Sequence, residues 1–346
     1  MHMSDALITP LVGGSMLASS FGVIRHSIKK IDTEILEKRI PYMGVVGAFV
    51  FASQMINFAI PGTGSSGHIG GGMLLAILLG PHAGFLTMGS ILLIQALFFA
   101  DGGLLAFGCN LMNLGFFTCY VAYPFIYKPM ASFRNDGAPK SKMKIYAAAI
   151  TASVIGLQLG SLGVVLETIL SGRSDLPIGL FLSFMQPIHL AIGIVEGVVT
   201  AAVVGYLYER REDLHFDFFK NEGSVSKRGQ SPTRRTVQVI LVVALVIGGF
   251  FSQYASSSPD GLEWSIENVS AHTVTENSTI ANTLGEIQDQ AAILPDYGFK
   301  ETVENSTLAT IGTSVSGITG SLITLMVVSL IGFVFRSINR RKVRKI

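Results

Sequence analysis

Long apolar runs are the feature that most limits what this chain can fold into. A helix needs about 20 apolar residues to cross the roughly 30 Å hydrocarbon core of a bilayer. Only 14% of the 346 residues are charged, against about 25% in soluble proteins. The sequence therefore predicts an all-α polytopic membrane protein with nine apolar segments, of which the third is short and rich in glycine. These segments are about 7–24, 41–60, 69–80, 83–100, 103–127, 145–170, 178–208, 236–253 and 308–335.

The basic residues between these segments predict their orientation. Cytoplasmic loops of membrane proteins are enriched in Lys and Arg. Of the 25 basic residues, 23 fall into four connecting stretches that would all lie on one side, and the two exceptions are Arg173 and Lys300. The four stretches are 25–39, 128–144, 209–235 and 336–346. This distribution predicts an N-terminus outside the cell and a C-terminus in the cytoplasm.

A polar linker divides the chain into two predicted modules. Residues 209–235 have the mixed-charge, Gly- and Ser-containing composition of a flexible connector. Residues 1–208 contain seven of the apolar segments, and residues 236–346 contain the other two. The second module would be a transmembrane hairpin around an acidic external loop, 254–307, with nine Asp or Glu residues and one Lys.

The first residues of the chain have the composition of a metal chelator. Met1 and His2 offer a free α-amine, a backbone nitrogen and an imidazole, which together can close a five- and a six-membered ring around one ion. A nitrogen-rich, tetragonal ligand set suits Ni(II) or Cu(II). The alternatives are a chance Met-His start, a cloning scar and a cleaved signal peptide. A signal peptide begins with basic residues, and here none precedes Arg25.

His68 is the best candidate for a further metal ligand. It lies in a loop with six glycines between Pro61 and Gly72, and glycine permits close approach of a second chain segment. The predicted topology puts this loop and the N-terminus on the same outer face. A solvated loop histidine is the structural alternative.

Several other polar residues in apolar surroundings are candidates for supporting roles. Asp101, Asn110 and Asn113 could orient the histidines, or they could satisfy one another and nearby backbone groups. His189 and Glu196 lie seven residues apart, near one face of the seventh segment. Ionisable groups at membrane depth are functional candidates, and a hydrogen bond between helices is the alternative. The cysteines at 109 and 119 are expected to be buried thiols that act as small apolar side chains.

Four stretches together resemble the nickel/cobalt-specific substrate-binding component of energy-coupling-factor transporters. They are Met-His-Met-Ser-Asp-Ala-Leu at the start, Gly-Ser-Ser-Gly-His-Ile-Gly-Gly around His68, Phe-Ala-Asp-Gly-Gly-Leu-Leu-Ala from Phe99, and Pro-Ile-His-Leu-Ala-Ile-Gly-Ile-Val-Glu-Gly from Pro187. The resemblance implies a seven-helix bundle in the plasma membrane of a prokaryote, with the N-terminus folded back into the molecule. It also implies that the metal is held by the amine of Met1, the backbone and side-chain nitrogens of His2, and His68.

The second module is similar to the small accessory subunit of the same transporters. The similar motifs are Ser-Ser-Pro-Asp-Gly-Leu-Glu from Ser257 and Pro-Asp-Tyr-Gly-Phe from Pro295. The chain thus resembles a fusion of both subunits. The resemblance implies a non-catalytic protein without a cofactor, whose partners are a transmembrane coupling subunit and two cytosolic ATPases.

Two ladders of small residues could allow a partner helix to dock closely. One comprises Gly14, Ala18 and Gly22, and the other comprises Gly44, Ala48 and Ala52. Because the family's first helix is an addition, the second ladder corresponds to the docking helix of related proteins and is the preferred candidate. Ordinary internal packing is the alternative.

Three other functions would make different demands on the sequence. A cobalt importer that feeds cobalamin synthesis would need the same residues. An intramembrane hydrolase that uses His2, His68 and Asp101 would need an activated water and a general base, and a helical His-Glu-x-x-His motif is absent from the sequence. A secondary transporter driven by an ion gradient would typically have internal repeats and paired ionisable groups, for which only the His189–Glu196 pair is available.

Overall fold

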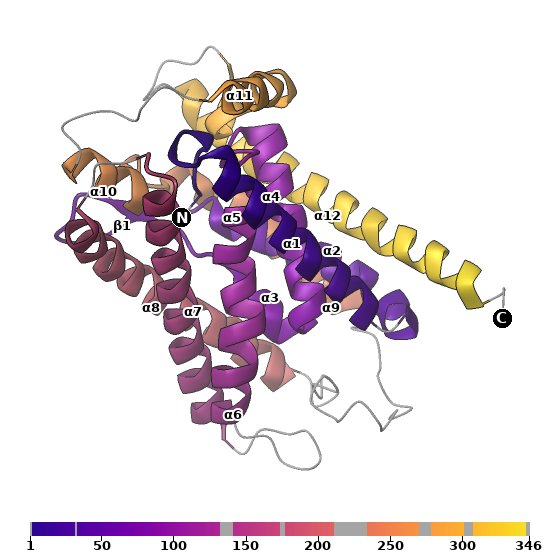
Figure 1. Ribbon diagram of the computed structural model, residues 1–346. Helices are drawn as coiled ribbons and strands as arrows, with labels where there is room; N and C mark the ends of the chain where they lie inside the picture. Colours follow the sequence, from indigo (N-terminus) through magenta and orange to yellow (C-terminus); the bar gives the residue numbers. More distant parts are fainter. Residues whose placement is uncertain are drawn as a thin grey trace.

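The computed structural model describes residues 2–31, 33–131, 141–173, 177–210, 234–269, 278–300 and 307–343. Nearly all regular structure in these ranges is helical (Figure 1). A short antiparallel pair, β1 (Phe58–Ala59) and β2 (Ser66–Gly67), closes the loop that precedes His68. The predicted all-α fold is confirmed.

The helices before residue 211 follow the order of the seven predicted segments. One of the seven is a continuous helix from residue 107 to residue 131 that contains a π-helical stretch. The elements are α1 (Pro10–Lys30), α2 (Thr33–Gln54), α3 (Gly72–Leu79), α4 (Pro81–Phe99), the continuous series α5 (Phe107–Leu111), η2 (Met112–Tyr127) and α6 (Lys128–Ala131), then α7 (Lys142–Leu170) and α8 (Ile178–Arg210).

The remainder of the chain supplies two long helices and several short ones. The long helices are α9 (Arg234–Gly249) and α12 (Thr307–Val343). The sequence predicts a plain loop between them, but the structure has 3-10 turns η4 (Phe251–Tyr254) and η5 (Pro295–Tyr297) and helices α10 (Gly261–Val269) and α11 (Thr279–Ala291) there. The start of α10 has a physical signal in the sequence. Asp260 Oδ1 accepts the backbone N–H groups of Leu262 and Glu263, both at 2.8 Å, which is an N-cap interaction.

Five described helices are long and apolar enough to cross a bilayer, as expected of a polytopic membrane protein. They are Pro81–Phe99, Lys142–Leu170, Ile178–Tyr208, Arg235–Tyr254 and Ile311–Val334. The third predicted segment behaves differently. Helix α3 has eight residues, all buried, and is therefore about 12 Å long at 1.5 Å per residue. It ends inside the protein instead of crossing the bilayer.

Helix α12 packs along α2 (Figure 1) and contacts its ladder of small residues at Gly44. A Cβ atom added at Gly44 would lie 2.6 Å from Ser329 Oγ, and Ala48 and Ala52 are fully buried. The predicted partner-docking role of Gly44, Ala48 and Ala52 therefore does not fit this structure, because a helix of the same chain occupies that face. The alternative of internal packing accounts for these residues.

The other ladder is open. A Cβ atom at Gly14 or Gly22 would have nothing within 4 Å, and Ala18 is exposed. Leu11 and Phe21 on the same helix are also exposed. Helix α1 thus presents a small-residue face that no described residue of this chain covers.

Candidate metal centre

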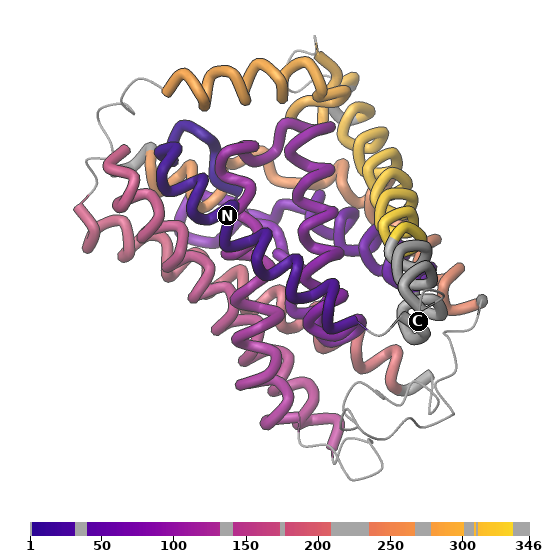
Figure 2. The backbone as a smooth tube through the Cα atoms, turned by 45° about the vertical axis from the view of Figure 1, so that its right-hand side comes forward, coloured from indigo at the N-terminus to yellow at the C-terminus, as the bar shows by residue number. Residues whose placement is uncertain are grey.

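The N-terminal peptide lies inside the molecule. Met3 and Ile8 are completely buried, in an apolar cluster that also contains Leu262 of α10 and Ala281 of α11. Figure 2 shows α11 lying across the end of the bundle at which α1 begins. Met1 lies outside the described residues.

Asn110 fixes the backbone of this peptide. Its side-chain oxygen accepts the N–H of Met3 at 2.7 Å, and its side-chain nitrogen donates to the carbonyl of Met3 at 3.1 Å. The N–H of Gly103 donates to the same carbonyl at 2.9 Å. A Cβ atom at Gly103 would lie 1.8 Å from Asp5 Oδ1, so the N-terminal segment passes this loop at a distance that only glycine permits.

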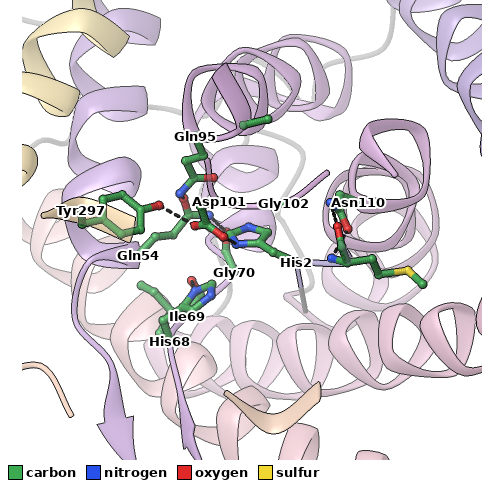
Figure 3. Close-up of polar contacts among 12 residues, drawn as sticks. His2, Gln54, His68, Ile69, Gly70, Gln95, Asp101, Gly102, Asn110 and Tyr297 are labelled. Atoms are coloured by element: carbon green, nitrogen blue, oxygen red, sulfur yellow. Dashed lines mark hydrogen bonds and ion pairs between the residues drawn. The ribbon is translucent and has the colours of Figure 1, made fainter. Parts of the chain in front are cut away.

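The fold brings the rings of His2 and His68 together, with centroids 5.2 Å apart and planes tilted by 32° (Figure 3). His2 Nδ1 lies 2.8 Å from Asp101 Oδ1, and His68 Nδ1 lies 3.0 Å from the carbonyl oxygen of Ile69. Because an acceptor faces each Nδ1, that nitrogen carries a proton in both rings. His2 Nε2 is buried, and none of the described residues forms a hydrogen bond with it.

The arrangement differs in one respect from the predicted chelate. The six-membered ring that includes the backbone nitrogen of His2 must be closed by Nδ1, because Nε2 is too far along the imidazole. In the structure Nδ1 faces Asp101 instead. The two histidines are thus brought together, but the nitrogen required for the chelate is held by a carboxylate.

The charges at the site favour a cation. Burial alone would raise the pKa of Asp101, but the adjacent His2 and the hydrogen bonds from His2 and Tyr297 hold this pKa well below its usual range. Burial and repulsion by His2 lower the pKa of His68 to about 4. At neutral pH the site therefore presents a negative carboxylate and a neutral His68 imidazole, the form that binds a metal.

The His68 loop is held by side chains from three helices. Glu196 of α8 accepts the N–H of Gly70 at 2.7 Å. Gln54 of α2 donates to the carbonyl of Gly70 at 2.7 Å, and Gln95 of α4 donates to Gln54 at 2.9 Å. Neither glutamine is marked as a site residue by the sequence, because a single amide within an apolar helix has no distinguishing pattern.

His189 and Glu196 do not form a pair with each other. His189 Nδ1 bonds the carbonyl oxygen of Met185 in its own helix at 2.7 Å, whereas Glu196 reaches the loop at Gly70. Among the described residues, none on another helix forms a hydrogen bond with His189, so the structural alternative of a hydrogen bond between helices is not seen for this residue. Its ring lines a small cavity together with His68 and Asp260.

Asn110 and Asn113 contact Met3 rather than the histidines. Asn113 Nδ2 donates to Glu167 Oε2 at 2.7 Å and lies 4.0 Å from Met3 Sδ. Of the three residues predicted to orient the histidines, Asp101 alone bonds one of the two rings. Glu167 is buried in α7 and is another polar residue that no sequence pattern marks.

The second module, residues 236–346, contacts both loops of the site, the one that carries His68 and the one that carries Asp101. At the His68 loop, the backbone N–H of Ser66 donates to the carbonyl of Pro259 at 2.8 Å, and its hydroxyl donates to the carbonyl of Ser258 at 2.7 Å. At the other loop, the hydroxyl of Tyr297 donates to Asp101 Oδ2 at 2.5 Å (Figure 3). This tyrosine belongs to the Pro-Asp-Tyr-Gly-Phe motif, but nothing in the sequence indicates that Asp101 is its partner.

Side chains alone do not complete a metal site. In the described part of the chain, no group of three or more His, Cys, Asp or Glu side chains is arranged to hold a metal ion. The cysteines at 109 and 119 are free and buried, as expected. A cation at the two histidines would thus need further ligands, such as backbone or terminal nitrogens.

Two family models match the chain. The cobalt uptake substrate-specific transmembrane region matches residues 2–214, and the PDGLE domain matches residues 234–337. A protein of Archaeoglobus fulgidus described as a fused nickel transport protein is 31% identical over 94% of this chain and 96% of its own length. The cobalt transport protein CbiM of Sorangium cellulosum is 33% identical over 62% of this chain and 94% of its own length.

A solved structure is also similar. The crystal structure of a truncated transition metal transporter aligns with 61% of this chain and 100% of its own, with 30% sequence identity and a TM-score of 0.52.

Proposed function

Because the chain belongs to the family of the cobalt uptake substrate-specific transmembrane region, we propose that it captures divalent nickel, or cobalt, for import into the cell. The observation that carries this proposal is the meeting of His2 and His68, whose ring centroids are 5.2 Å apart beside the charged Asp101. The relatives named as nickel and cobalt transport proteins support the substrate class.

The cation is held by the α-amine of Met1, the backbone nitrogen and imidazole of His2, and the imidazole of His68. Backbone and terminal nitrogens supply the ligands that the side chains lack. To close the chelate, the His2 ring turns by half a revolution about its Cβ–Cγ bond. This turn frees Nδ1 and exchanges Nε2 with Cε1, so that Nε2 becomes the ring nitrogen nearer to Asp101.

The chain performs this capture as two modules. Residues 1–208 form the substrate-binding component and residues 236–346 the accessory module, joined by the linker 209–235. The N-terminus and the loop 254–307 face the outside, and the basic stretches face the cytoplasm. Transport through the membrane is driven by partners, a transmembrane coupling subunit and two cytosolic ATPases, and the chain itself catalyses no reaction.

Nickel is the preferred substrate on chemical grounds. A nitrogen-rich, tetragonal ligand set binds Ni(II) more tightly than Co(II). The relative named as a cobalt transport protein favours cobalt as the second candidate. Competition between the two ions, followed through their d–d absorption spectra, distinguishes these substrates.

The decisive experiment adds one residue before Met1. The full-length protein is purified in detergent and titrated with Ni(II) in a calorimeter. The added residue removes the amine from its position, so tight binding should be lost while the thermal unfolding temperature stays the same. His2→Ala and His68→Ala should have the same effect, and His26→Ala, at the exposed far end of α1, is the matched control.

Two results would overturn the proposal. The first is normal Ni(II) binding by the extended protein, which would exclude the amine as a ligand. The second is metal uptake in cells that lack the coupling subunit and the ATPases, which would favour a secondary transporter.

A further inference from the structure

Tyr297 joins the accessory module to the ligand His2 through a single carboxylate. Its hydroxyl donates to Asp101 Oδ2 at 2.5 Å, and Asp101 Oδ1 lies 2.8 Å from His2 Nδ1 (Figure 3). Both carboxylate oxygens thus have a partner, one in the accessory module and one in the N-terminal peptide. A carboxylate held at both oxygens has a defined orientation toward the ring it contacts.

The accessory module also holds the backbone on both sides of Asp101. The side-chain nitrogen of Gln288 in α11 donates to the carbonyls of Ala96 and Gly102 at 2.9 and 2.7 Å. The N–H of Ile293 donates to the carbonyl of Phe98 at 3.0 Å. These contacts fix the end of α4 and the turn that follows it, so the position of Asp101 depends on residues of the accessory module.

The backbone at Tyr297 is in an unusual conformation. Asp296 and Tyr297 have φ angles of +48° and +59°, in the left-handed region that residues other than glycine seldom adopt. The Tyr297 ring stacks on Phe99 at a centroid distance of 5.0 Å. Residues in this region are often found at functional sites, and here the hydroxyl of one of them bonds Asp101.

We propose that Tyr297 is a positioning residue of the metal site, through which the accessory module orients the imidazole of His2. Tyr297 fixes Asp101, and Asp101 accepts a hydrogen bond from whichever His2 ring nitrogen is not bound to the metal. In the metal-free protein that nitrogen is Nδ1, and in the loaded protein it is Nε2. The ring therefore keeps a hydrogen-bond partner in both states.

This role extends the proposed function and rests on it. It also differs from a packing role in a way that can be measured. If Tyr297 only filled space against Phe99, its hydroxyl would be dispensable and the state of His2 would not depend on it. If Tyr297 acts through Asp101, removal of the hydroxyl changes both the tautomer of His2 and the affinity for metal.

The test uses Tyr297→Phe in the full-length protein, because phenylalanine keeps the stacking on Phe99. Loss of the group hydrogen-bonded to a metal ligand typically weakens metal binding by about 10- to 100-fold. This range applies to Asp101→Asn, and Tyr297→Phe, which acts one residue further from the ligand, should weaken Ni(II) binding in calorimetry by at most about 10-fold. Nitrogen-15 NMR of the labelled histidines should show a smaller fraction of the Nδ1–H tautomer at His2. Tyr254→Phe is the matched control, since Tyr254 belongs to the same module and is 71% exposed.

A double variant tests whether the effect passes through Asp101. Asp101→Asn alters the same connection between Tyr297 and His2 but keeps the packing of Tyr297. It therefore provides the test if Tyr297→Phe fails to fold. If Tyr297 acts through Asp101, the double variant should bind Ni(II) no more weakly than Asp101→Asn alone. Additive losses would overturn the proposal, as would a Tyr297→Phe protein with normal affinity and an unchanged His2 spectrum.

The outcomes also separate this inference from the proposed function. If the N-terminal extension and His68→Ala abolish binding but Tyr297→Phe does not, the inference is wrong and the proposed function stands. If the extended protein binds Ni(II) normally, the proposed function itself is wrong.

Discussion

Asn110→Ala should weaken metal binding without touching any proposed ligand. The side chain of Asn110 is 3% exposed and bonds both the N–H and the carbonyl of Met3, at 2.7 and 3.1 Å. Alanine leaves the buried N–H of Met3 without an acceptor, whereas the carbonyl keeps its bond from Gly103 at 2.9 Å. A buried donor without a partner costs about 1–3 kcal/mol, so the inserted N-terminal peptide should lose about 2 kcal/mol of stability.

This loss translates into affinity because only the inserted peptide can present the amine and His2. When the binding-competent state becomes less populated, the apparent dissociation constant rises in proportion. A change of about 2 kcal/mol corresponds to about 30-fold, which is the largest weakening expected for Ni(II). Calorimetry measures the affinity, and cleavage by an aminopeptidase in the absence of metal measures release of the N-terminus.

Ser90→Ala is the matched control for Asn110→Ala. Ser90 is buried in α4, and its hydroxyl bonds the carbonyl of Leu86 within the same helix at 3.0 Å. Its removal should lower the unfolding temperature slightly and leave both Ni(II) affinity and protection of the N-terminus as they are. If Asn110→Ala released the N-terminus to the peptidase but bound Ni(II) as tightly as the native protein, insertion of the peptide would not be needed for metal capture.

Three further predictions concern the loops and the helix packing. Gly103→Ala should release the N-terminal peptide more completely than Asn110→Ala does, because the new Cβ would lie 1.8 Å from Asp5 Oδ1; aminopeptidase cleavage and Ni(II) calorimetry check this. The metal-free protein should lose stability as the pH falls from about 6.5 to about 4. In this range the unfolded chain takes up a proton at His68, whereas the folded protein, in which the pKa of His68 is lowered to about 4, does not. The thermal unfolding temperature of His68→Gln should therefore depend less on pH. Gly44→Leu should destabilise the protein by about 1–3 kcal/mol through overpacking, whereas Gly14→Leu, with open space around it, should not; thermal unfolding of the two variants decides this.

The helices were predictable because the bilayer restricts the sequence strongly. A spanning helix must be long and apolar, and this requirement marks helices such as α7 and α8 directly in the sequence. Helix α3 is an exception to this requirement. Its eight apolar residues resemble the core of a span, but they are shielded by surrounding protein instead of lipid. Hydropathy cannot distinguish these two apolar environments.

The two histidines of the site were predictable for a different reason. The distribution of basic residues predicts one outer face for His2 and His68, and the glycines around His68 predict room for a second segment. What could not be predicted is which nitrogen each ring presents. That choice depends on the acceptors beside the rings, Asp101 and the carbonyl of Ile69, and their positions result from the tertiary fold.

Contacts between the modules were the least predictable part of the structure. Nothing in the spacing of Gly44, Ala48 and Ala52 distinguishes a face for a separate partner from a face for α12 of the same chain. Similarly, Tyr297 and Asp101 are 196 residues apart, and neither lies in a pattern that indicates the other. Pairings over such separations depend on the relative placement of helices, which local sequence patterns do not determine.

The fusion of the two modules has a physical consequence for the site. The accessory module contacts the His68 loop through Ser258 and Pro259 and the Asp101 loop through Tyr297 and Gln288, so both halves of the site depend on its presence. The two modules belong to one chain, and α12 is fixed by its packing along α2. Each copy of the chain can therefore keep Asp101 oriented toward His2 without recruiting a separate subunit. In the proposed chelate, capture of the ion requires that His2 Nδ1 is released from Asp101.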